Sequence, residues 1–522
     1  MYDCPEAYVL FMMVNSYYNK IDTIVILKVN NMKKIRTRYA PSPTGYFHVG
    51  GARSALFCYL FAKHYNGDFI FRIEDTDVER NVEHGIESQY DNLLWLGIVP
   101  DESMFHPNPK YEPYIQSKKL TLYQEVANEL LNKGLAYRCF CTPDELEQMR
   151  QNSLASHQTP KYNRRCMHLT PVQINEKLNN HEPYVIRLII PENKNYEWND
   201  MIRGKIVIPS EALTDLVLLK SNGIGSYNFC NVIDDHDMQI THIIRGEEHI
   251  SNTPYQLAII DALKQLPRYI NSKEDFDFTY GHLPVVVNTN GKKLSKRDTS
   301  LKQFIGDYKE MGFLPMAIDN FLVSLGWSAP NNQEYFSNLQ EIIAMFDGTR
   351  ISKSPGIFDF KKMVYLNKKH LDALSDEQYL QAVKPFVKED LCELASKKDE
   401  VLLLFRKDLK ILGEINGFIH ELLNPTPCEI TDEVKQVMTN AKEHHLFITA
   451  KAQLETIDDW TNDNISNWLK NLATTCNLKG KDLYLPLRFS LFHQLHGPEF
   501  VKLVHLFGKQ YCLDQLQMQI DH

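Results

Sequence analysis

The sequence predicts an α/β fold that binds a nucleotide, followed by an all-α region. Residues 35–40 have the pattern of a strand, a loop containing two prolines and a glycine follows, and residues 52–65 have a helical apolar pattern ending near Gly67. Residues 68–75 form a second strand pattern that ends in acidic side chains. From about residue 370 onward the apolar spacing is helical, and no convincing strand is found.

Composition limits the possible classes of protein. The 522 residues are enough for two to four domains, and 43% apolar with 24% charged residues is typical of a soluble globular protein. The net charge of −9 means that any nucleic-acid surface is a local basic patch. No apolar run approaches the roughly 20 residues that a membrane span needs. Residues 1–31 lack a signal-peptide pattern, so we expect a cytoplasmic protein with a non-functional N-terminal extension.

The loop between the first strand and the first helix suits a phosphate. A strand, a tight loop and a helix N-terminus bring backbone N–H groups to one point. His48 is placed where its imidazole could donate to a phosphate oxygen, although a core histidine at a helix start fits the four-residue motif equally well. The candidate ATP-binding residues here are Pro41, Ser42, Pro43, Thr44, Gly45, His48, Gly50 and Gly51.

A second candidate phosphate loop lies about 240 residues later, at residues 291–298. It follows an apolar strand at 283–287 and a polar turn at 288–291. A basic run is usually a solvated loop, but here the cations bracket a Leu-Ser pair and could stabilise a polyphosphate. The candidate ATP-binding residues are Lys293, Leu294, Ser295, Lys296 and Arg297.

Together the two loops resemble the paired signatures of class I aminoacyl-tRNA synthetases. Residues 72–77 (Arg-Ile-Glu-Asp-Thr-Asp) and 231–236 (Asn-Val-Ile-Asp-Asp-His) further resemble bacterial glutamyl-tRNA synthetases, and the resemblance runs from about residue 33 to the C-terminus. Gly51 replaces the second histidine of the first signature, and Leu294 and Arg297 replace the usual methionine and last serine of the second.

The resemblance implies a class I Rossmann-type nucleotide-binding fold with an inserted acceptor-binding domain, followed by an all-α anticodon-binding region. The expected boundaries are 1–31 for the extension, 32–119 and 226–275 for the two halves of the catalytic domain, and 120–225 for the insertion. Residues 276–365 would contact the tRNA stem and carry the basic loop, and 366–522 would bind the anticodon.

The resemblance also implies the reaction: L-glutamate is joined to tRNA(Glu), and ATP is converted to AMP and pyrophosphate. The implied cofactor for this reaction is Mg²⁺ with ATP, and the implied oligomeric state is a monomer. His48 and Lys296 would be the catalytic residues, acting on phosphate charge. A guanidinium pairs a carboxylate in a bidentate fork, although an isolated arginine is more often part of a structural salt bridge. The implied glutamate-binding residues are Arg38, Ser42, Glu74, Tyr227, Asn231 and Arg245.

Four side chains are candidates for a structural zinc site. Cys139 and Cys141 are followed, after 24 intervening residues, by Cys166 and His168. Four protein ligands can close a tetrahedron round one Zn²⁺ without an open position, whereas the simpler alternative is a chance cluster of buried cysteines. The spacing resembles the zinc-bearing version of the family. Nearby aromatic and basic residues are expected to meet a single-stranded RNA end, namely Tyr137, Arg138, Tyr162, Arg164 and Arg165.

Two other classes of function compete with this interpretation. A short paralogue that glutamylates a modified tRNA base would lack the helical C-terminal third, which is present here. A non-catalytic tRNA-binding protein would tolerate loss of His48 or Lys296, and both are present. Asp408 falls roughly where family members that discriminate between tRNAs place an arginine, so charging of glutamine tRNA stays open.

Overall fold

The computed structural model describes residues 33–77, 80–157, 160–294, 302–425 and 431–521. The predicted extension at 1–31 and the predicted site residues Ser295, Lys296 and Arg297 lie outside these ranges. The chain forms two compact units: one holds residues up to Ile305 and Leu322–Phe358, and the other holds Gly306–Phe321 and residues from Asp359 onward.

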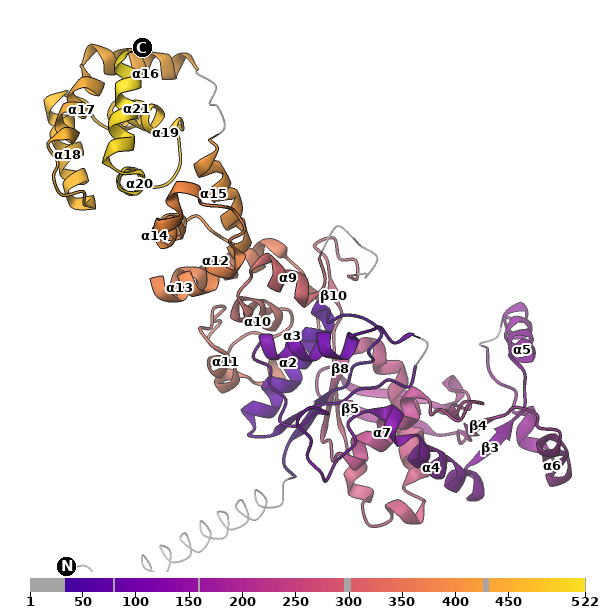
Figure 1. Ribbon diagram of the computed structural model, residues 1–522. Coiled ribbons are helices and arrows are strands. Elements are labelled where there is room, and N and C mark those ends of the chain that lie inside the picture. Colours follow the sequence, from indigo (N-terminus) through magenta and orange to yellow (C-terminus); the bar gives the residue numbers. More distant parts are fainter. Residues whose placement is uncertain (1–32, 78–79, 158–159, 295–301, 426–430, 522) are drawn as a thin grey trace, which may run out of the picture. The chain divides into compact units, whose positions relative to one another are not determined.

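A four-stranded parallel sheet forms the centre of the first unit (Figure 1). Its strands are β1 (Arg36–Tyr39), β2 (Asp68–Phe71), β8 (His242–Gly246) and β9 (Thr279–Leu283), in the order β2-β1-β8-β9. The chain leaves β1 toward β2 on one side and reaches β8 on the other only after the insertion. In parallel sheets, the crevice beyond the carboxyl ends of strands at such a reversal is where ligands bind.

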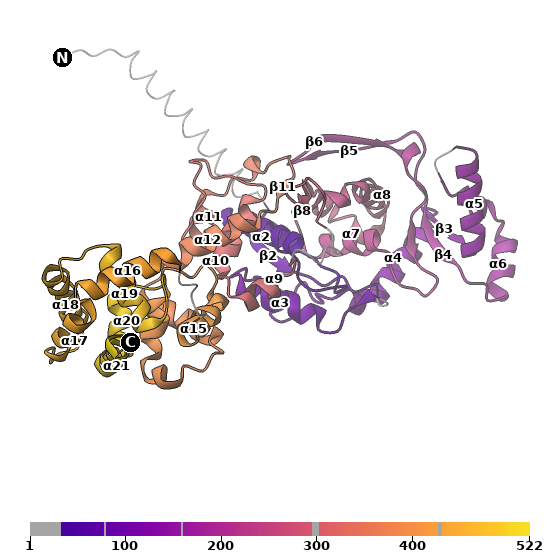
Figure 2. The same ribbon diagram turned by 90° about the horizontal axis from the view of Figure 1, so that it is seen from above.

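The two faces of this sheet carry different side chains, because successive residues of a strand point to opposite faces. On β1, the Thr37 hydroxyl donates to the Cys58 carbonyl of α2 (Val49–His64), whereas Arg38 pairs with Asp235 of α7 (Tyr227–Asp237). Helix α2 therefore covers one face, and α7 with α8 (Thr253–Leu263) covers the other; Figure 2 shows the strands between them. The face toward α7 and α8 carries buried arginines at several strand ends.

Most of the predicted elements of this unit are present, with shifted ends. Residues 85–97 and 117–133 have amphipathic helical patterns, and they form α3 (Gly85–Trp95) and α4 (Leu120–Asn132). Gly134 follows α4 at positive φ, as the pattern predicted, whereas Gly97, also at positive φ, lies beyond the end of α3 and not inside it. The predicted strand at 68–75 ends at Phe71, which leaves Glu74 beyond the sheet. The prediction of a single strand at 283–287 is wrong, because β9 ends at Leu283 and a separate strand, β10, is Val286–Val287. Between them, Arg53 donates to the Pro284 carbonyl and Glu247 accepts the Val285 N–H, so both polar groups of this peptide are hydrogen-bonded to side chains.

The inserted segment forms its own small sheets. Strands β3 (Ala136–Cys139), β4 (Val185–Leu188) and β7 (Val217–Leu219) pair antiparallel, and β5 (Asn195–Asp200) forms a hairpin with β6 (Gly204–Pro209). Helices α5 (Pro143–Ala155) and α6 (Pro171–Asn179) each start at a threonine whose side chain forms a capping box. Later in the first unit come α11 (Leu339–Met345) and β11 (Gly356–Ile357), which pairs with β10.

The second unit is helical, as predicted. Among the described residues no strand follows β11, and apolar side chains from successive helices pack into one core. None of the helices in the described ranges is both long and apolar enough to cross a membrane. Helix α9 (Ile305–Met311) begins at the boundary of this unit and α10 (Pro315–Ser324) runs across it; the others are α12 (Phe360–Ala373), α13 (Asp376–Val383), α14 (Lys398–Leu404), α15 (Ile415–Leu423), α16 (Asp432–Glu443), α17 (Leu446–Glu455), α18 (Asn462–Thr475), α19 (Lys481–Phe492), α20 (Phe500–Phe507) and α21 (Lys509–Asp521).

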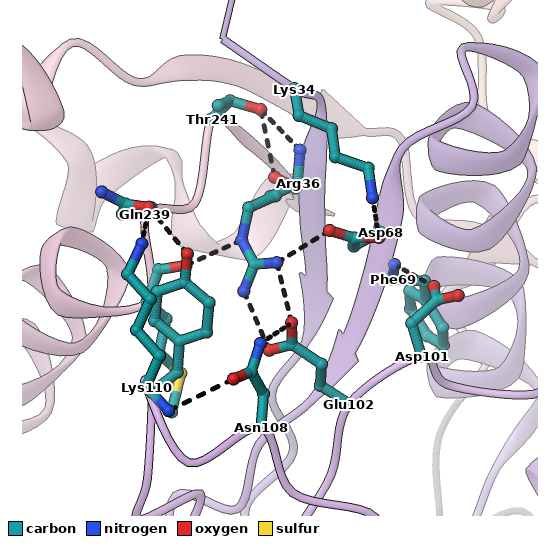
Figure 3. A network of polar contacts seen from close by, with 12 residues as sticks. Lys34, Arg36, Asp68, Phe69, Asp101, Glu102, Asn108, Lys110, Gln239 and Thr241 are labelled. Carbon is teal, nitrogen blue, oxygen red and sulfur yellow. Dashed lines mark hydrogen bonds and ion pairs between the residues drawn. The ribbon is translucent and has the colours of Figure 1, made fainter.

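A buried ionic network fixes the end of β1 that lies away from the crevice (Figure 3). The Arg36 guanidinium donates to both carboxylate oxygens of Glu102 at 2.9 Å and to Asp68 at 2.8 Å, and it covers the Tyr111 ring. Burial alone would raise the pKa of Glu102, but hydrogen bonds from Arg36, Tyr114 and Asn108 outweigh it and lower that pKa. The network ties β1 to β2 and to the loop at 101–114.

Glu102→Gln is expected to lower the free energy of unfolding by about 2 kcal/mol at neutral pH, because it removes the charge from these hydrogen bonds. A carboxyl whose pKa is depressed in the folded state stabilises above its unfolded pKa and loses that effect as pH falls. The difference between the two proteins should therefore shrink from about pH 5 to about pH 3. Urea unfolding at several pH values checks this, with exposed Glu176→Gln as control. If the difference in free energy of unfolding between wild type and Glu102→Gln stayed the same at low pH, the prediction would be wrong.

Candidate active site

A cavity of about 490 Å³ lies beyond the carboxyl ends of β1 and β8, in the crevice that the strand order predicts. It brings together residues from the two candidate phosphate loops and from the motifs at 72–77 and 231–236. Its lining includes all six candidate glutamate-binding residues, and from the two candidate ATP loops it includes Pro41, Ser42, Thr44, Gly45, His48, Gly50, Gly51, Lys293 and Leu294.

His48 is the N-cap of α2. Its Nδ1 accepts the backbone N–H of Gly51 at 3.2 Å, which leaves Nε2 to carry the proton of the neutral imidazole. One side chain therefore caps the helix with one nitrogen and can present a donor with the other. A helix N-terminus favours negative charge, so the site has the features of an anion site.

The glycines after His48 lie inside the helix, not in the loop before it. The helix was predicted from Ala52 and begins at Val49, because the His48 cap supports an earlier first turn. A Cβ added at Gly51 would lie 2.6 Å from the Tyr39 hydroxyl oxygen, a distance that real Cβ contacts do not reach. A side chain at position 51 would therefore have to displace the Tyr39 hydroxyl, which donates to Gln89.

Charged side chains below the cavity form a buried cluster. Arg38 binds both oxygens of Asp235, from Nε at 3.0 Å and Nη2 at 3.1 Å, and Arg72 donates to Asp235 at 2.7 Å and to Glu74 at 2.8 Å. Burial would raise the pKa of Asp235, but the two guanidinium groups outweigh it and lower that pKa. For Glu74, burial wins against Arg72 and raises the pKa.

A chain of hydrogen bonds connects Glu74 to Arg245 across the pocket. Asn231 Nδ2 donates to Glu74 Oε1 at 2.7 Å, Gln256 Nε2 donates to Asn231 Oδ1 at 3.2 Å, and Arg245 Nη2 donates to Gln256 Oε1 at 2.8 Å. Arg245 Nη1 is buried and has no hydrogen-bond partner among the described residues. A buried donor without a partner is costly unless a ligand accepts from it.

Two family models match nearly the whole chain. The one described as tRNA synthetases class I (E and Q), catalytic domain, matches residues 34–365, and the anticodon binding domain matches residues 368–520. The glutamate–tRNA ligase of Malacoplasma penetrans is 47% identical over 495 residues, which cover 95% of this chain and 99% of the relative. This chain belongs to the bacterial glutamate–tRNA ligases. The second family model covers the helical third that the short paralogue would lack.

Further comparisons with this family agree. The glutamate–tRNA ligase of Mycoplasma genitalium is 43% identical over 493 residues, with 94% of this chain and 99% of the relative covered. A solved structure of a glutamate tRNA ligase from Elizabethkingia meningosepticum, in complex with its amino acid, has a TM-score of 0.81 at 31% identity and covers 94% of this chain and 99% of that chain. The predicted fold class, a class I catalytic domain followed by a helical anticodon-binding domain, is confirmed.

Three residues around the ligase pocket were not predicted from the sequence. Arg53 of α2 is buried and donates from Nη1 to the Pro284 carbonyl at 2.6 Å, next to the base of the basic loop, and burial lowers its pKa to about 10. Gln89 accepts from the Tyr39 hydroxyl at 3.1 Å, and His249 lies beside the Tyr227 ring. Conversely, Pro43 is absent from the lining: it is buried, and its carbonyl accepts the Val82 N–H.

The predicted zinc ligands are only partly brought together. The sulfurs of Cys139, Cys141 and Cys166 lie within 4.8 Å of one another, but His168 is exposed and is not in this group. The Tyr162 hydroxyl lies 3.3 Å from the Cys139 sulfur and 3.4 Å from the Cys141 sulfur. Burial opposes ionisation of Cys139, yet hydrogen bonds from Tyr162 and Arg187 lower its pKa. The chemistry of these donors suits Zn²⁺.

The residues predicted to meet an RNA end are mostly engaged within the insertion. Tyr137 is buried and donates to Asp215, which also accepts from Arg164, and Arg165 pairs with Glu145. Arg138 is half-buried and lies over the Tyr184 ring. Sequence composition cannot separate an RNA-binding arginine from one held by a carboxylate distant in the chain.

Proposed function

We propose that the cavity activates L-glutamate with ATP and transfers it to the 3′-terminal ribose of tRNA(Glu), with release of AMP and pyrophosphate. The observation that carries this proposal is the arrangement of charge in one cavity. Two arginines, Arg38 and Arg245, and one carboxylate, Glu74, lie next to the capped N-terminus of α2. An acidic amino acid offers two carboxylates and one ammonium, which is the complementary set of charges.

The order of the first step follows from this layout. With glutamate on the arginines and the ATP phosphates at the start of α2, a carboxylate oxygen of glutamate attacks the α-phosphorus and pyrophosphate leaves. Charge grows on the phosphates as that bond breaks. His48 and Lys296 would stabilise this charge by position and electrostatics, without acting as bases. Mg²⁺ would arrive with ATP and neutralise phosphate charge.

In the second step the ribose hydroxyl of tRNA attacks the glutamyl-adenylate. The reaction needs no separate editing site, because a pocket whose buried polar groups require a carboxylate leaves them unpaired when a neutral isostere binds. The same argument predicts that free glutamine is rejected as the amino acid, whichever tRNA is charged.

An aminoacylation assay with the purified full-length chain tests the proposal. With tRNA(Glu) present, because the family resemblance implies a bound tRNA for the activation step, we expect glutamate-dependent exchange of pyrophosphate into ATP and charging of the tRNA, with glutamine inactive as amino acid. Charging of glutamine tRNA with glutamate, in a parallel reaction, measures the tRNA range that Asp408 leaves open. Exchange that proceeds equally with glutamine would contradict the assigned pocket.

We further propose that the ligase acts as a monomer. This is the oligomeric state that the family resemblance implies. Sedimentation velocity at assay concentrations tests this, and a concentration-dependent dimer would contradict it.

We also propose one structural Zn²⁺ in the insertion, held by the thiolates of Cys139, Cys141 and Cys166. The fourth ligand was predicted to be His168, but the contacts favour the Tyr162 hydroxyl, which lies beside two of the sulfurs and also accepts the Cys166 N–H at 3.2 Å. A site with four protein ligands has no position for substrate, so the ion would stabilise the fold of the insertion.

Purified wild-type chain is expected to hold about one zinc per molecule, and Cys141→Ser should lose it together with the folding energy that it contributes. Tyr162→Phe should weaken zinc binding in competition with a chelator, whereas His168→Ala should not. Metal analysis and melting of the full-length variants check this. Zinc loss in His168→Ala but not Tyr162→Phe would restore the histidine as ligand, and zinc-free wild type would end the proposal.

A further inference from the structure

A buried row of three polar side chains runs from the insertion to the amino-acid pocket. Asp200 ends β5 in the inserted hairpin, His282 lies on β9, and Arg245 lies beside it on β8. His282 Nδ1 donates to Asp200 Oδ2 at 2.5 Å, and His282 Nε2 accepts from Arg245 Nε at 3.2 Å. The side chains of Asp200 and His282 are fully buried.

The geometry sets the protonation of this row. A carboxylate that accepts at Nδ1 places the imidazole proton there, so Nε2 is left as an acceptor. Burial lowers the pKa of His282, which favours the neutral ring. A protonated ring, or the other tautomer, would point an N–H at the N–H of Arg245 Nε. The Thr253 hydroxyl, 3.2 Å from Nε2, completes the surroundings of this nitrogen.

The row leaves one part of the Arg245 guanidinium for a ligand. Nε is held by His282, and Nη2 donates to Thr253 at 2.9 Å and to Gln256 at 2.8 Å. Nη1 is the buried nitrogen without a partner among the described residues, and Arg245 lines the cavity. The guanidinium is thus fixed on two sides and presents its third side.

The tip of the inserted hairpin is itself firmly held. Asp200 Oδ1 accepts the backbone N–H groups of Ile202, Arg203 and His282 at 3.0, 2.9 and 3.2 Å. Met201 N donates to the Tyr280 carbonyl of β9 at 2.9 Å. The carboxylate that orients the imidazole is therefore fixed to the sheet at several points, as a rigid supporting residue requires.

We propose that Asp200 and His282 are positioning residues that hold the Arg245 guanidinium in the orientation that binds the substrate carboxylate. This rests on the proposed glutamate pocket. Neither residue lines the cavity, so each acts through Arg245. Because Asp200 belongs to the insertion, the amino-acid pocket is completed by the same segment that is expected to grip the tRNA end.

Two substitutions at His282 separate positioning from packing. Asparagine places its amide near the position of Nδ1 and loses the acceptor for Arg245, whereas glutamine can place its carbonyl near the position of Nε2 and keep it. We expect His282→Asn to raise the KM for glutamate by about 10-fold to 100-fold, the cost of a displaced binding group, with the KM for ATP unchanged. His282→Gln should recover most of that loss.

Further variants of the full-length chain keep the result interpretable. Asp200→Asn preserves shape but no longer dictates the tautomer, so it should also raise the KM for glutamate selectively. Melting curves identify variants that fail to fold. Equal effects of His282→Asn and His282→Gln, or equal increases in the KM for ATP, would overturn the positioning role. Arg245→Lys separates the two proposals. If it leaves the KM for glutamate unchanged, the glutamate pocket itself is refuted. If it raises the KM for glutamate but His282→Asn and Asp200→Asn do not, only the positioning role of Asp200 and His282 is refuted.

Discussion

His48→Asn is expected to slow the formation of glutamyl-adenylate by about 100-fold to 1,000-fold, the usual cost of removing one donor to developing oxyanion charge. The side-chain oxygen of asparagine can still accept the Gly51 N–H, as His48 Nδ1 does at 3.2 Å. What it cannot supply is the donor at the far end of the ring. Because phosphate charge grows mainly in the transition state, the turnover rate should fall much more than the affinity for ATP.

His48→Ala is the matched control for capping. It loses the donor and the cap, so it should show the same fall in rate and also a loss of about 1 kcal/mol in stability. Rapid-quench measurement of adenylate formation, with urea unfolding of both variants, tells the two roles apart. If His48→Asn merely raised the KM for ATP at full turnover, His48 would be a ground-state anchor. If only His48→Ala were slow, the histidine would act through the helix cap.

Sequence reasoning was most successful where function depends on short, local patterns. The two signature loops, the strand that precedes Glu74 and the strand that carries Arg245 can each be recognised within about ten residues, and each of these segments contributes residues to the cavity. Strand order then explains why these loops meet, since the carboxyl ends of β1 and β8 are neighbours in a parallel sheet. The assignment of roles to Lys296 and Arg297 stays a prediction from the resemblance.

Contacts between segments that are distant in the chain could not be predicted from the sequence. Tyr162 was grouped with RNA-binding aromatics, yet its hydroxyl lies among the cysteine sulfurs, and local spacing pointed instead to His168. Arg53 lies within the apolar helix α2, where nothing in the pattern indicates a bond to the Pro284 carbonyl 231 positions later. The start of α2 was missed because the capping residue is a histidine, which preference rules for N-caps do not favour.

The buried Asp235 leads to the largest expected effect on stability. Its carboxylate binds Arg38 at two points and Arg72 at one, and all three side chains are 4% exposed or less. Asp235→Asn keeps the volume but removes the charge that both guanidinium groups share, and it turns an N–H donor toward one of them. Breaking a buried ion pair by altering one partner typically costs about 3–5 kcal/mol.

We therefore expect Asp235→Asn to lower the free energy of unfolding by about 4 kcal/mol and Tm by about 10 °C. Asp237→Asn, the same change near the partly exposed end of the same helix, should cost less than about 1 kcal/mol. The KM for glutamate should rise in Asp235→Asn alone, because Arg38 loses its anchor beside the pocket. Urea unfolding and steady-state kinetics of both variants check this. Similar stability of the two would show that packing, and not charge pairing, holds the arginine cluster in place.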